Sequence, residues 1–307
     1  MKWQTTLIPK QNNNMDLFFS FAKRINRPLL LDGAMGSLLQ QKGIKSHPQL
    51  WMSMANLTHP KEVLKAHQAY IKAGADIITT NTFRTNPVSI KKSNEIISGF
   101  DFVQKSVKLA KTAVGDKQII IAGSNPPAED CYQVKRTISK KEIEANHVEH
   151  IEYLITSGCN FILNETQSHL DEILFVAKFC NNNSIPYVMS LFFTNKLKLL
   201  SGENLFDVIR TIEEFSPLAI SLNCILPKTF QKVFRKLNKD KSWGFYLNCG
   251  SDAFNHENIT CGISPIDYSQ EVKKYLKKNP IFIGSCCGSS PNHTKELQKL
   301  LDEKNSN

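Results

Sequence analysis

The chain has 307 residues, 41% of them apolar and 21% charged, which is the composition of an ordinary globular protein. No apolar run approaches the roughly 20 residues that cross a bilayer, and no signal-peptide cleavage pattern is evident, so we expect a cytoplasmic protein. Eight cysteines without export indicate reduced thiols rather than a disulfide framework. The net charge of +10 comes from lysines interleaved with acidic residues, which indicates a solvated surface and neither nucleic-acid nor membrane binding.

Along the chain, short apolar runs alternate with longer amphipathic stretches. Residues 1–27 are predicted to form a polar leader with one short helix, and residues 28–307 to form a single domain. Each apolar or β-branched run in that domain ends in small or polar residues, as a buried strand does at a loop. The eight predicted strands are residues 28–31, 76–79, 118–122, 160–163, 186–190, 218–222, 243–247 and 280–283.

Helical spacing fills several of the stretches between these strands. Residues 62–74 and 146–158 repeat apolar side chains every three or four positions and end in glycine, as helices often do. Strands that alternate with helices and are almost continuously apolar predict a parallel sheet covered on both faces. Eight such units in about 280 residues predict a (β/α)₈ barrel, with a doubly wound open sheet as the alternative.

The residues that follow the predicted strands are mostly polar, ionisable or thiol-bearing. In a barrel they share one rim, where the active sites of this fold are built, so the rim is predicted to carry a site. In chain order they are Asp32-Gly33, Thr80-Asn81-Thr82, Gly123-Ser124-Asn125, Glu165-Thr166, Leu191-Phe192, Asn223-Cys224, Asn248-Cys249 and Cys286-Cys287.

Three of these cysteines form a candidate metal site. Cys286 and Cys287 lie in a turn between Gly284 and Gly288, where two neighbouring thiols can converge on a metal or a redox partner. The alternative is that both are buried fillers. With Cys224, which follows the sixth strand, three thiolates would leave one tetrahedral position of Zn²⁺ open, as in catalytic zinc sites.

Two other residues are competing candidates for the metal. Cys249 follows the seventh strand, and a fourth thiolate from it would close the site and make the zinc structural. His293 is a nearby imidazole that could replace a thiolate. The remaining cysteines and histidines have no comparable spacing and are predicted to be structural.

Two carboxylates occupy similar positions at strand ends. Asp32 lies in the sequence LLLDGAMGS and Glu165 in FILNETQ, where either could hold an ammonium group or act as a base. Each alone could equally be a turn or helix cap. The glycines at 33 and 36 resemble a phosphate-binding loop only weakly, because the lysine and the spacing of such loops are missing.

Together these segments resemble the homocysteine S-methyltransferase family over nearly all of the chain after residue 27. The matching stretches are LLLDGAMGSLLQ, AHQAYIKAGADIITTNTFRTN, IAGSNPPAED, FILNETQ, ISLNC and GSCCGSSP, and the last two are the most specific. The resemblance implies a (β/α)₈ barrel in which Cys224, Cys286 and Cys287 bind Zn²⁺. It further implies that Asp32 and Glu165 hold the amino acid group of homocysteine.

The resemblance also implies the reaction. The zinc-bound thiolate of homocysteine would take a methyl group from a donor to give methionine. The chain has no room for cobalamin and folate domains, which leaves S-methylmethionine, S-adenosylmethionine or betaine as donor, and we favour the two sulfonium compounds. A selenocysteine acceptor and, more distantly, a thiol redox or metal-binding barrel without methyl transfer are the alternatives.

Two segments depart from the family pattern. Asn125-Pro126-Pro127 replaces a stretch that usually contains more glycine, and Cys249 stands where a small residue is more usual. Both are candidates for contact with the methyl donor. The sequence makes no prediction of oligomeric state.

Overall fold

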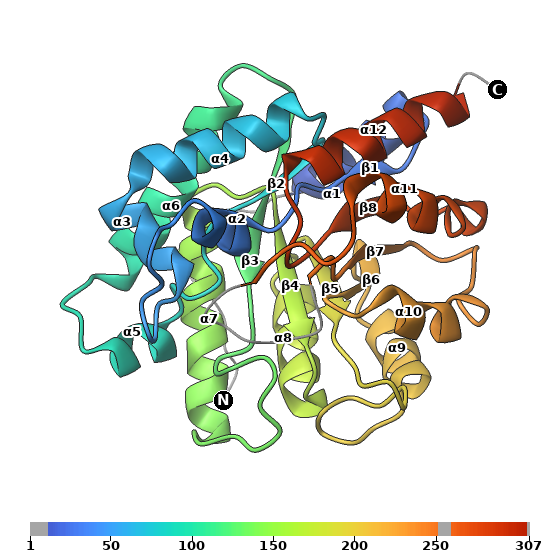
Figure 1. Ribbon diagram of the computed structural model, residues 1–307. Helices are drawn as coiled ribbons and strands as arrows, with labels where there is room; N and C mark the ends of the chain where they lie inside the picture. Colours follow the sequence, from blue (N-terminus) through green and yellow to red (C-terminus); the bar gives the residue numbers. More distant parts are fainter. Residues whose placement is uncertain (1–11, 251–258, 306–307) are drawn as a thin grey trace.

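In a computed structural model of the protein, which describes residues 12–250 and 259–305, eight parallel strands form one nearly closed sheet (Figure 1). Neighbours follow the order β1-β8-β7-β6-β5-β4-β3-β2, and a bridge between Leu31 and Ile77 joins the two ends. The protein is therefore a single-domain (β/α)₈ barrel, as predicted, and the open-sheet alternative is wrong. The strands are β1 (Leu29–Leu30), β2 (Ile77–Thr79), β3 (Ile120–Asn125), β4 (Phe161–Gln167), β5 (Tyr187–Leu191), β6 (Ala219–Asn223), β7 (Trp243–Leu247) and β8 (Phe282–Ser285).

Helices surround this sheet on its outer face. The predicted helices at 62–74 and 146–158 are confirmed as α4 and α7, and α7 begins with a capping box between Ser139 and Glu142. No helix of the described residues is long and apolar enough to cross a membrane. The helices are α1 (Asn12–Ile25), α2 (Met35–Gln41), α3 (Ala55–Thr58), α4 (Pro60–Lys72), α5 (Pro87–Ser93), α6 (Gly99–Val114), α7 (Lys140–Thr156), α8 (Leu170–Asn182), α9 (Leu205–Glu213), α10 (Pro227–Phe234), α11 (Pro265–Lys273) and α12 (Pro291–Asn305), with 3₁₀ turns at Met52–Met54 and Leu276–Lys278.

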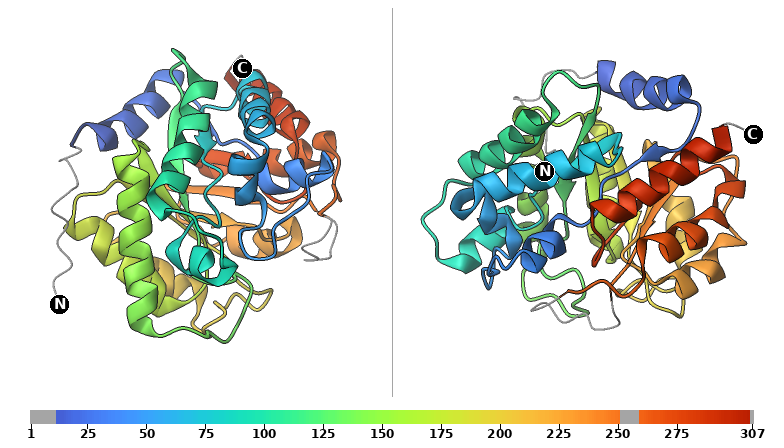
Figure 2. Two further views of the ribbon diagram at one scale, coloured as in Figure 1. Left: turned by 90° about the vertical axis from the view of Figure 1, so that its left-hand side faces the viewer. Right: turned by 45° about the horizontal axis from the view of Figure 1, so that its top comes forward.

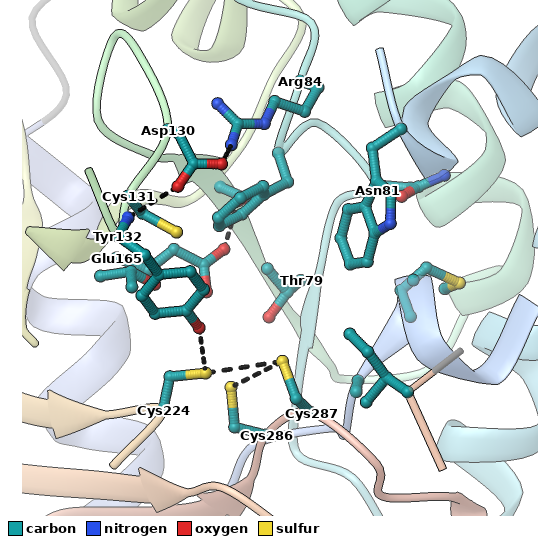
Figure 3. A pocket seen from close by; sticks show the side chains of 18 of the residues that line it. Thr79, Asn81, Arg84, Asp130, Cys131, Tyr132, Glu165, Cys224, Cys286 and Cys287 are labelled. Atoms are coloured by element: carbon teal, nitrogen blue, oxygen red, sulfur yellow. Dashed lines mark hydrogen bonds and ion pairs between the residues drawn. The ribbon is translucent and has the colours of Figure 1, made fainter. Parts of the chain in front are cut away.

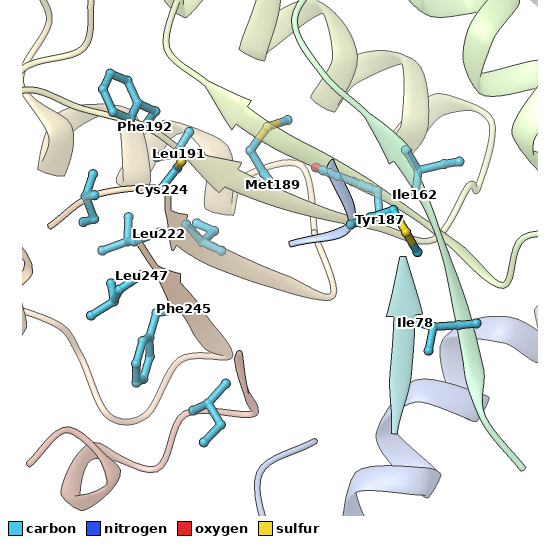
Figure 4. Close-up of a cluster of buried hydrophobic side chains, with 14 of the residues drawn as sticks. Ile78, Ile162, Tyr187, Met189, Leu191, Phe192, Leu222, Cys224, Phe245 and Leu247 are labelled. Atoms are coloured by element: carbon cyan, nitrogen blue, oxygen red, sulfur yellow. The ribbon is translucent and has the colours of Figure 1, made fainter. Parts of the chain in front are cut away.

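Successive side chains of each strand point alternately outward and inward, and this divides the apolar core into two parts. Side chains such as Ile78, Ile162 and Phe245 point outward and pack beneath the helices (Figure 4). The inward-pointing side chains fill the barrel at the amino ends of the strands, where α1 covers it (Figure 2). Phe18 of α1 is 1% exposed and meets Phe161 edge-on, with ring centroids 5.5 Å apart. The amino end of the barrel is thus closed by apolar packing.

Two strands extend further than the sequence pattern predicted. β3 continues to Asn125 and β4 to Gln167, so Ser124 and Glu165 lie within strands and not after them. The pairing of β4 with β5 shifts register between Asn164 and Gln167, because Thr166 has a φ of +60°. Such a bulge lets a strand bend and re-aim a side chain without ending.

Candidate active site

A cavity of about 620 Å³ opens at the carboxyl ends of the strands, on the rim where the site was predicted (Figure 3). It contains both of the predicted carboxylates and all three of the predicted metal ligands. Its lining includes Asp32, Trp51, Thr79, Phe83, Arg84, Glu129, Asp130, Cys131, Tyr132, Glu165, Cys224, Tyr246, Asn248, Cys286 and Cys287.

The three cysteines gather their sulfur atoms at one side of this cavity. Cys224 Sγ lies 3.5 Å from Cys287 Sγ, Cys286 Sγ lies 4.0 Å from Cys287 Sγ, and all three sulfurs lie within 4.8 Å of one another. Tetrahedral Zn²⁺ with Zn–S bonds of about 2.3 Å separates its sulfurs by about 3.8 Å. The donor set and its spacing therefore fit a metal ion that prefers thiolates.

The turn after β8 brings two adjacent cysteines to the same side. The Cys286 amide donates to Leu247 O at 2.8 Å and so continues the sheet, whereas Gly288 has a φ of +81° and turns the chain away. A Cβ atom at Gly288 would lie 2.5 Å from Gly250 Cα, so only glycine fits there. The Gly288 amide is held by Ser37 Oγ at 3.0 Å.

Cys224 reaches the site through an unusual backbone conformation. Its φ is +55°, which is uncommon for a residue other than glycine and is frequent at functional sites. The preceding Asn223 side chain reaches past β5 to β4, since its Oδ1 accepts from the Thr166 amide at 3.0 Å and its Nδ2 donates to Thr166 Oγ1 at 2.9 Å. Asn223 thus joins the strand that carries Cys224 to the strand that carries Glu165.

Hydrogen bonds make Cys224 the sulfur that most readily carries negative charge. Those from Cys286 and Cys287, and then that from Tyr132, hold the pKa of the Cys224 thiol well below its usual range. Burial has the opposite effect on this pKa, and its influence is smaller than that of the two cysteine bonds but larger than that of the Tyr132 bond. The cysteines of this group are free thiols in the structure, with Cys224 buried and the other two half-buried.

Asp32 is buried and faces the cavity from the end of β1. Its carboxylate accepts hydrogen bonds from the Thr79 amide at 2.9 Å and from Thr79 Oγ1 at 3.0 Å. Burial outweighs these bonds and raises the pKa of Asp32 to about 8. An ammonium group that entered the cavity would favour the charged form of this carboxyl.

Glu165 lines the cavity from the bulged part of β4. The Ser124 hydroxyl donates to its Oε1, and Tyr246 Oη donates to its Oε2 at 3.4 Å. Burial again dominates and raises the pKa of Glu165 to about 7, and the negative charge of Cys224 contributes in the same direction. Asp32 is thus a buried carboxyl and Glu165 a half-buried one, and neither has a basic partner among the contacts described here.

The two competing candidates lie apart from the sulfur cluster. Cys249 is fully buried, does not line the cavity, and directs its thiol to Leu247 O at 3.6 Å. His293 holds the turn after β8: its Nε2 donates to Ile263 O at 3.0 Å and its Nδ1 accepts from the Ser290 amide at 3.1 Å. Neither belongs to the group of side chains that could share one metal ion.

The segments that depart from the family pattern lie away from the cavity. Asn125, Pro126 and Pro127 are buried behind its wall, where the Asn125 side chain contacts His147 Nδ1 at 3.1 Å and His150 Nδ1 at 2.9 Å. Neither these residues nor Cys249 line the cavity, so their predicted contact with a methyl donor gains no support from the structure. The extension of β3 turns the Asn125 side chain into the helical layer instead.

The glycines at 33 and 36 have a packing role. A Cβ atom at Gly36 would lie 2.2 Å from the Trp51 ring, and one at Gly33 would lie 2.7 Å from Ser289 Oγ. The close approach places Trp51 at the cavity, where it meets Phe83 edge-on with ring centroids 5.9 Å apart.

Several site residues were missed by sequence reasoning because they do not follow a strand directly. Tyr132 lies in the loop between β3 and α7 and contacts Cys224 Sγ at 2.9 Å. Tyr246 is an inward position of β7, and Trp51 lies in the segment between α2 and α4. The length of the loop after β3 and its four charged residues, Glu129, Asp130, Lys135 and Arg136, are the signal that was available.

The match to known proteins is extensive. The family model of homocysteine S-methyltransferases matches residues 29–301. The chain belongs to the homocysteine S-methyltransferase family. It is therefore an enzyme of the methyltransferase class, with small molecules as substrates.

Similar proteins have been described in plants, animals and bacteria. Homocysteine S-methyltransferase 2 of Zea mays is 22% identical, with 90% of each chain covered, and betaine-homocysteine S-methyltransferase of Drosophila melanogaster is 25% identical over 83% of this chain and 88% of its own. Among solved structures, the metallated form of the homocysteine methyltransferase MmuM from Escherichia coli has a TM-score of 0.74 at 21% identity, covering 89% of this chain and 96% of that one. These likenesses support the barrel fold.

Proposed function

We propose that this protein is a zinc-dependent homocysteine S-methyltransferase that forms methionine from homocysteine and a sulfonium donor, S-methylmethionine or S-adenosylmethionine. The observation that carries the proposal is the convergence of Cys224, Cys286 and Cys287 in one cavity with the carboxyls of Asp32 and Glu165. Family membership and the carboxyls both argue against a redox or metal-binding barrel without methyl transfer, which would leave Asp32 and Glu165 without a role.

The three sulfurs of the cluster would hold Zn²⁺. When bound, the zinc keeps the substrate sulfur as a thiolate, which is the nucleophilic form of a thiol. The chain's own part is to fix the geometry: β6 and β8 place the cysteines, and the backbone turns at Cys224 and Gly288 leave the side toward the cavity open. No residue needs to remove a proton during the transfer itself, so orientation is the chain's main contribution.

Asp32 and Glu165 would bind the ammonium group of homocysteine. Their raised pKa values, about 8 and about 7, mean that the empty cavity stabilises the neutral acids. Pairing with a cation reverses that preference, since a nearby positive charge favours the carboxylate. Thr79, Ser124 and Tyr246 hold the two carboxyls in place for this contact.

The cavity offers a place for a cationic donor. Its volume of about 620 Å³ is larger than homocysteine requires, and Trp51 and Phe83 present aromatic rings to it. Aromatic faces attract sulfonium and quaternary ammonium groups by the cation–π interaction. Betaine as donor and selenocysteine as acceptor remain alternatives with the same site chemistry.

One experiment tests the whole proposal. The purified protein is supplied with homocysteine and, separately, with S-methylmethionine, S-adenosylmethionine or betaine, and methionine and bound zinc are measured on the same preparation. We expect one zinc ion per chain and the fastest formation of methionine with a sulfonium donor. Protein without stoichiometric zinc, or full activity after Cys287→Ala, would contradict the proposal.

A further inference from the structure

We propose that Tyr132 is a positioning residue of the metal site, whose phenol hydroxyl donates a hydrogen bond to the Cys224 thiolate and stabilises the charge of the sulfur cluster. This inference rests on the proposed function in one respect, namely that the three cysteines bind zinc. It adds a residue outside the ligand set, contributed by a loop that the sequence did not mark.

The site has an excess of negative charge that calls for hydrogen-bond donors. Zn²⁺ with three cysteine thiolates and a substrate thiolate carries a net charge of about −2. Asp32 and Glu165 add further negative charge in the same cavity when they are ionised. Buried charge is costly unless hydrogen bonds or opposite charges satisfy it. The substrate ammonium offsets part of this charge, but only while homocysteine is bound.

Tyr132 supplies such a donor at the sulfur itself. Its Oη lies 2.9 Å from Cys224 Sγ, which is short for a hydrogen bond to sulfur (Figure 3). A thiolate cannot donate, so in the metal-loaded site the phenol must be the donor. Hydrogen bonds to ionised groups are roughly twice as strong as those between neutral groups.

The ring and backbone of Tyr132 are held in place for this contact. The ring meets Phe192 edge-on, with centroids 5.0 Å apart, and the Tyr132 amide donates to Asp130 Oδ1 at 2.8 Å. Asp130 is in turn paired with Arg84 at 3.3 Å, and Arg84 also donates to Glu129 O at 2.7 Å. A residue of the loop after β2 thus fixes the loop after β3.

A second set of contacts fixes the same loop from the side of the helices. The Ala128 amide donates to Glu172 Oε1 of α8 at 2.8 Å, and Arg136 binds Glu172 Oε2 at 3.1 Å. Lys92 of α5 pairs with Glu129 at 2.6 Å. The loop after β3 is therefore held by contacts with α8, with α5 and with Arg84 of the loop after β2. Groups outside the ligand shell that orient metal ligands are typically held in this way.

The experiment uses the full chain with Tyr132→Phe, which keeps the ring against Phe192 and removes only the hydroxyl. Zinc affinity is measured by competition with a chromogenic chelator, and Co²⁺ replaces zinc to report the sulfur-to-metal charge-transfer band. Loss of the hydrogen bond raises the energy of the sulfur lone pair. We therefore expect the band of the variant to move to longer wavelength and zinc affinity to fall by about 10- to 100-fold.

Two further variants separate the hydroxyl from general effects on folding. Tyr153→Phe removes a phenol that donates to Glu149 at 2.6 Å on the outer face of α7, and it should leave the band and the affinity unchanged. Asp130→Ala keeps the phenol and the sulfur but loosens the loop, and it should move both readouts in the same direction as Tyr132→Phe by a smaller amount. Thermal unfolding of the metal-free proteins shows that the variants are folded.

The outcomes distinguish this inference from the proposed function. If the wild-type protein binds no zinc, both fail. If the wild-type protein binds zinc but Tyr132→Phe has an unchanged band and affinity, or if Tyr153→Phe changes them equally, the role of Tyr132 is overturned and the proposed function stands.

Discussion

The two ends of the barrel are built from the same eight strands and yet have opposite chemistry. At the amino ends, inward side chains such as Leu29 and Phe161 pack against α1 and exclude water. At the carboxyl ends, some of the same strands place a carboxyl or a thiol two residues after the last apolar position, as at Glu165 and Cys224. Residues that stabilise the fold thus lie at the amino ends of the strands, and residues of the candidate site lie at the carboxyl ends. Substitutions at the amino end should therefore lower the free energy of unfolding, and substitutions at the carboxyl end should lower zinc binding and activity.

The largest effect is expected from removal of a sulfur at the carboxyl end. Cys287→Ser should abolish stoichiometric zinc binding and lower methyl transfer by roughly 1000-fold or more, because the metal would lose one of three ligands. The free energy of unfolding of the metal-free protein should change by less than about 1 kcal/mol. Metal analysis, methionine formation and urea unfolding check this. Cys261→Ser, at an exposed cysteine, is the control and should change none of the three.

At the amino end of the barrel, a substitution should lower the free energy of unfolding and leave zinc binding unchanged. Phe18→Ala should lower the free energy of unfolding by about 3–5 kcal/mol, because it leaves a cavity beside Phe161. The folded fraction should keep its zinc and its KM for homocysteine. The adjacent Phe19 is 41% exposed, and Phe19→Ala should cost less than about 1 kcal/mol. Equal losses at the two positions would mean that α1 does not close the barrel as described.

A smaller effect is expected within the cavity. Glu165→Gln should raise the KM for homocysteine by about 10- to 100-fold, because the ammonium group loses a charged partner. Zinc content should stay at one per chain, since Glu165 is not among the sulfur ligands. Steady-state kinetics at saturating donor measures the change, and Glu149→Gln on the exposed face of α7 is the control. A loss of zinc in Glu165→Gln would show that the carboxyl supports the metal and not the substrate.

The last expected effect is a change in the pH dependence of stability. The pKa of Asp32 is about 8 in the folded protein against an ordinary 3.8, so between these pH values the folded state keeps a proton that the unfolded chain has lost. The free energy of unfolding of the metal-free protein should therefore fall as pH rises from 4 toward 8. Asp32→Asn cannot titrate and should flatten this decline, which urea unfolding at pH 5 and pH 8 would detect. Parallel curves for the two proteins would argue against a raised pKa.

The parts of the site that could be predicted from the sequence are those whose position follows from the strands alone. Asp32 follows an apolar run directly, Cys224 and Cys286 follow the ends of β6 and β8, and in a parallel barrel all such positions lie on one rim. The eight strands themselves were recognisable because both of their faces are buried and their sequences are therefore almost continuously apolar.

The rest depends on contacts between distant segments. Tyr132 reaches Cys224 because distant residues hold its loop, among them Arg84, which lies 46 residues before Asp130. Trp51 lies at the cavity because Gly36 leaves room for its ring, and no local pattern encodes that approach. Cys249 shows the opposite case: it follows a strand as the ligands do, but its thiol is directed to Leu247 O and away from the cavity.

The junction of β1 and β2 contains a backbone amide, that of Thr79, whose hydrogen exchange depends on the state of Asp32 in the site. These two strands meet at a single bridge, and beyond it the barrel is closed by the hydrogen bonds from Thr79 to the carboxyl of Asp32. Exchange of the Thr79 amide hydrogen with solvent therefore depends on how firmly that carboxyl is held. A ligand that binds Asp32 acts on the junction where β1 and β2 share a single bridge. Binding in the cavity can therefore be followed by the rate at which the Thr79 amide hydrogen exchanges with solvent.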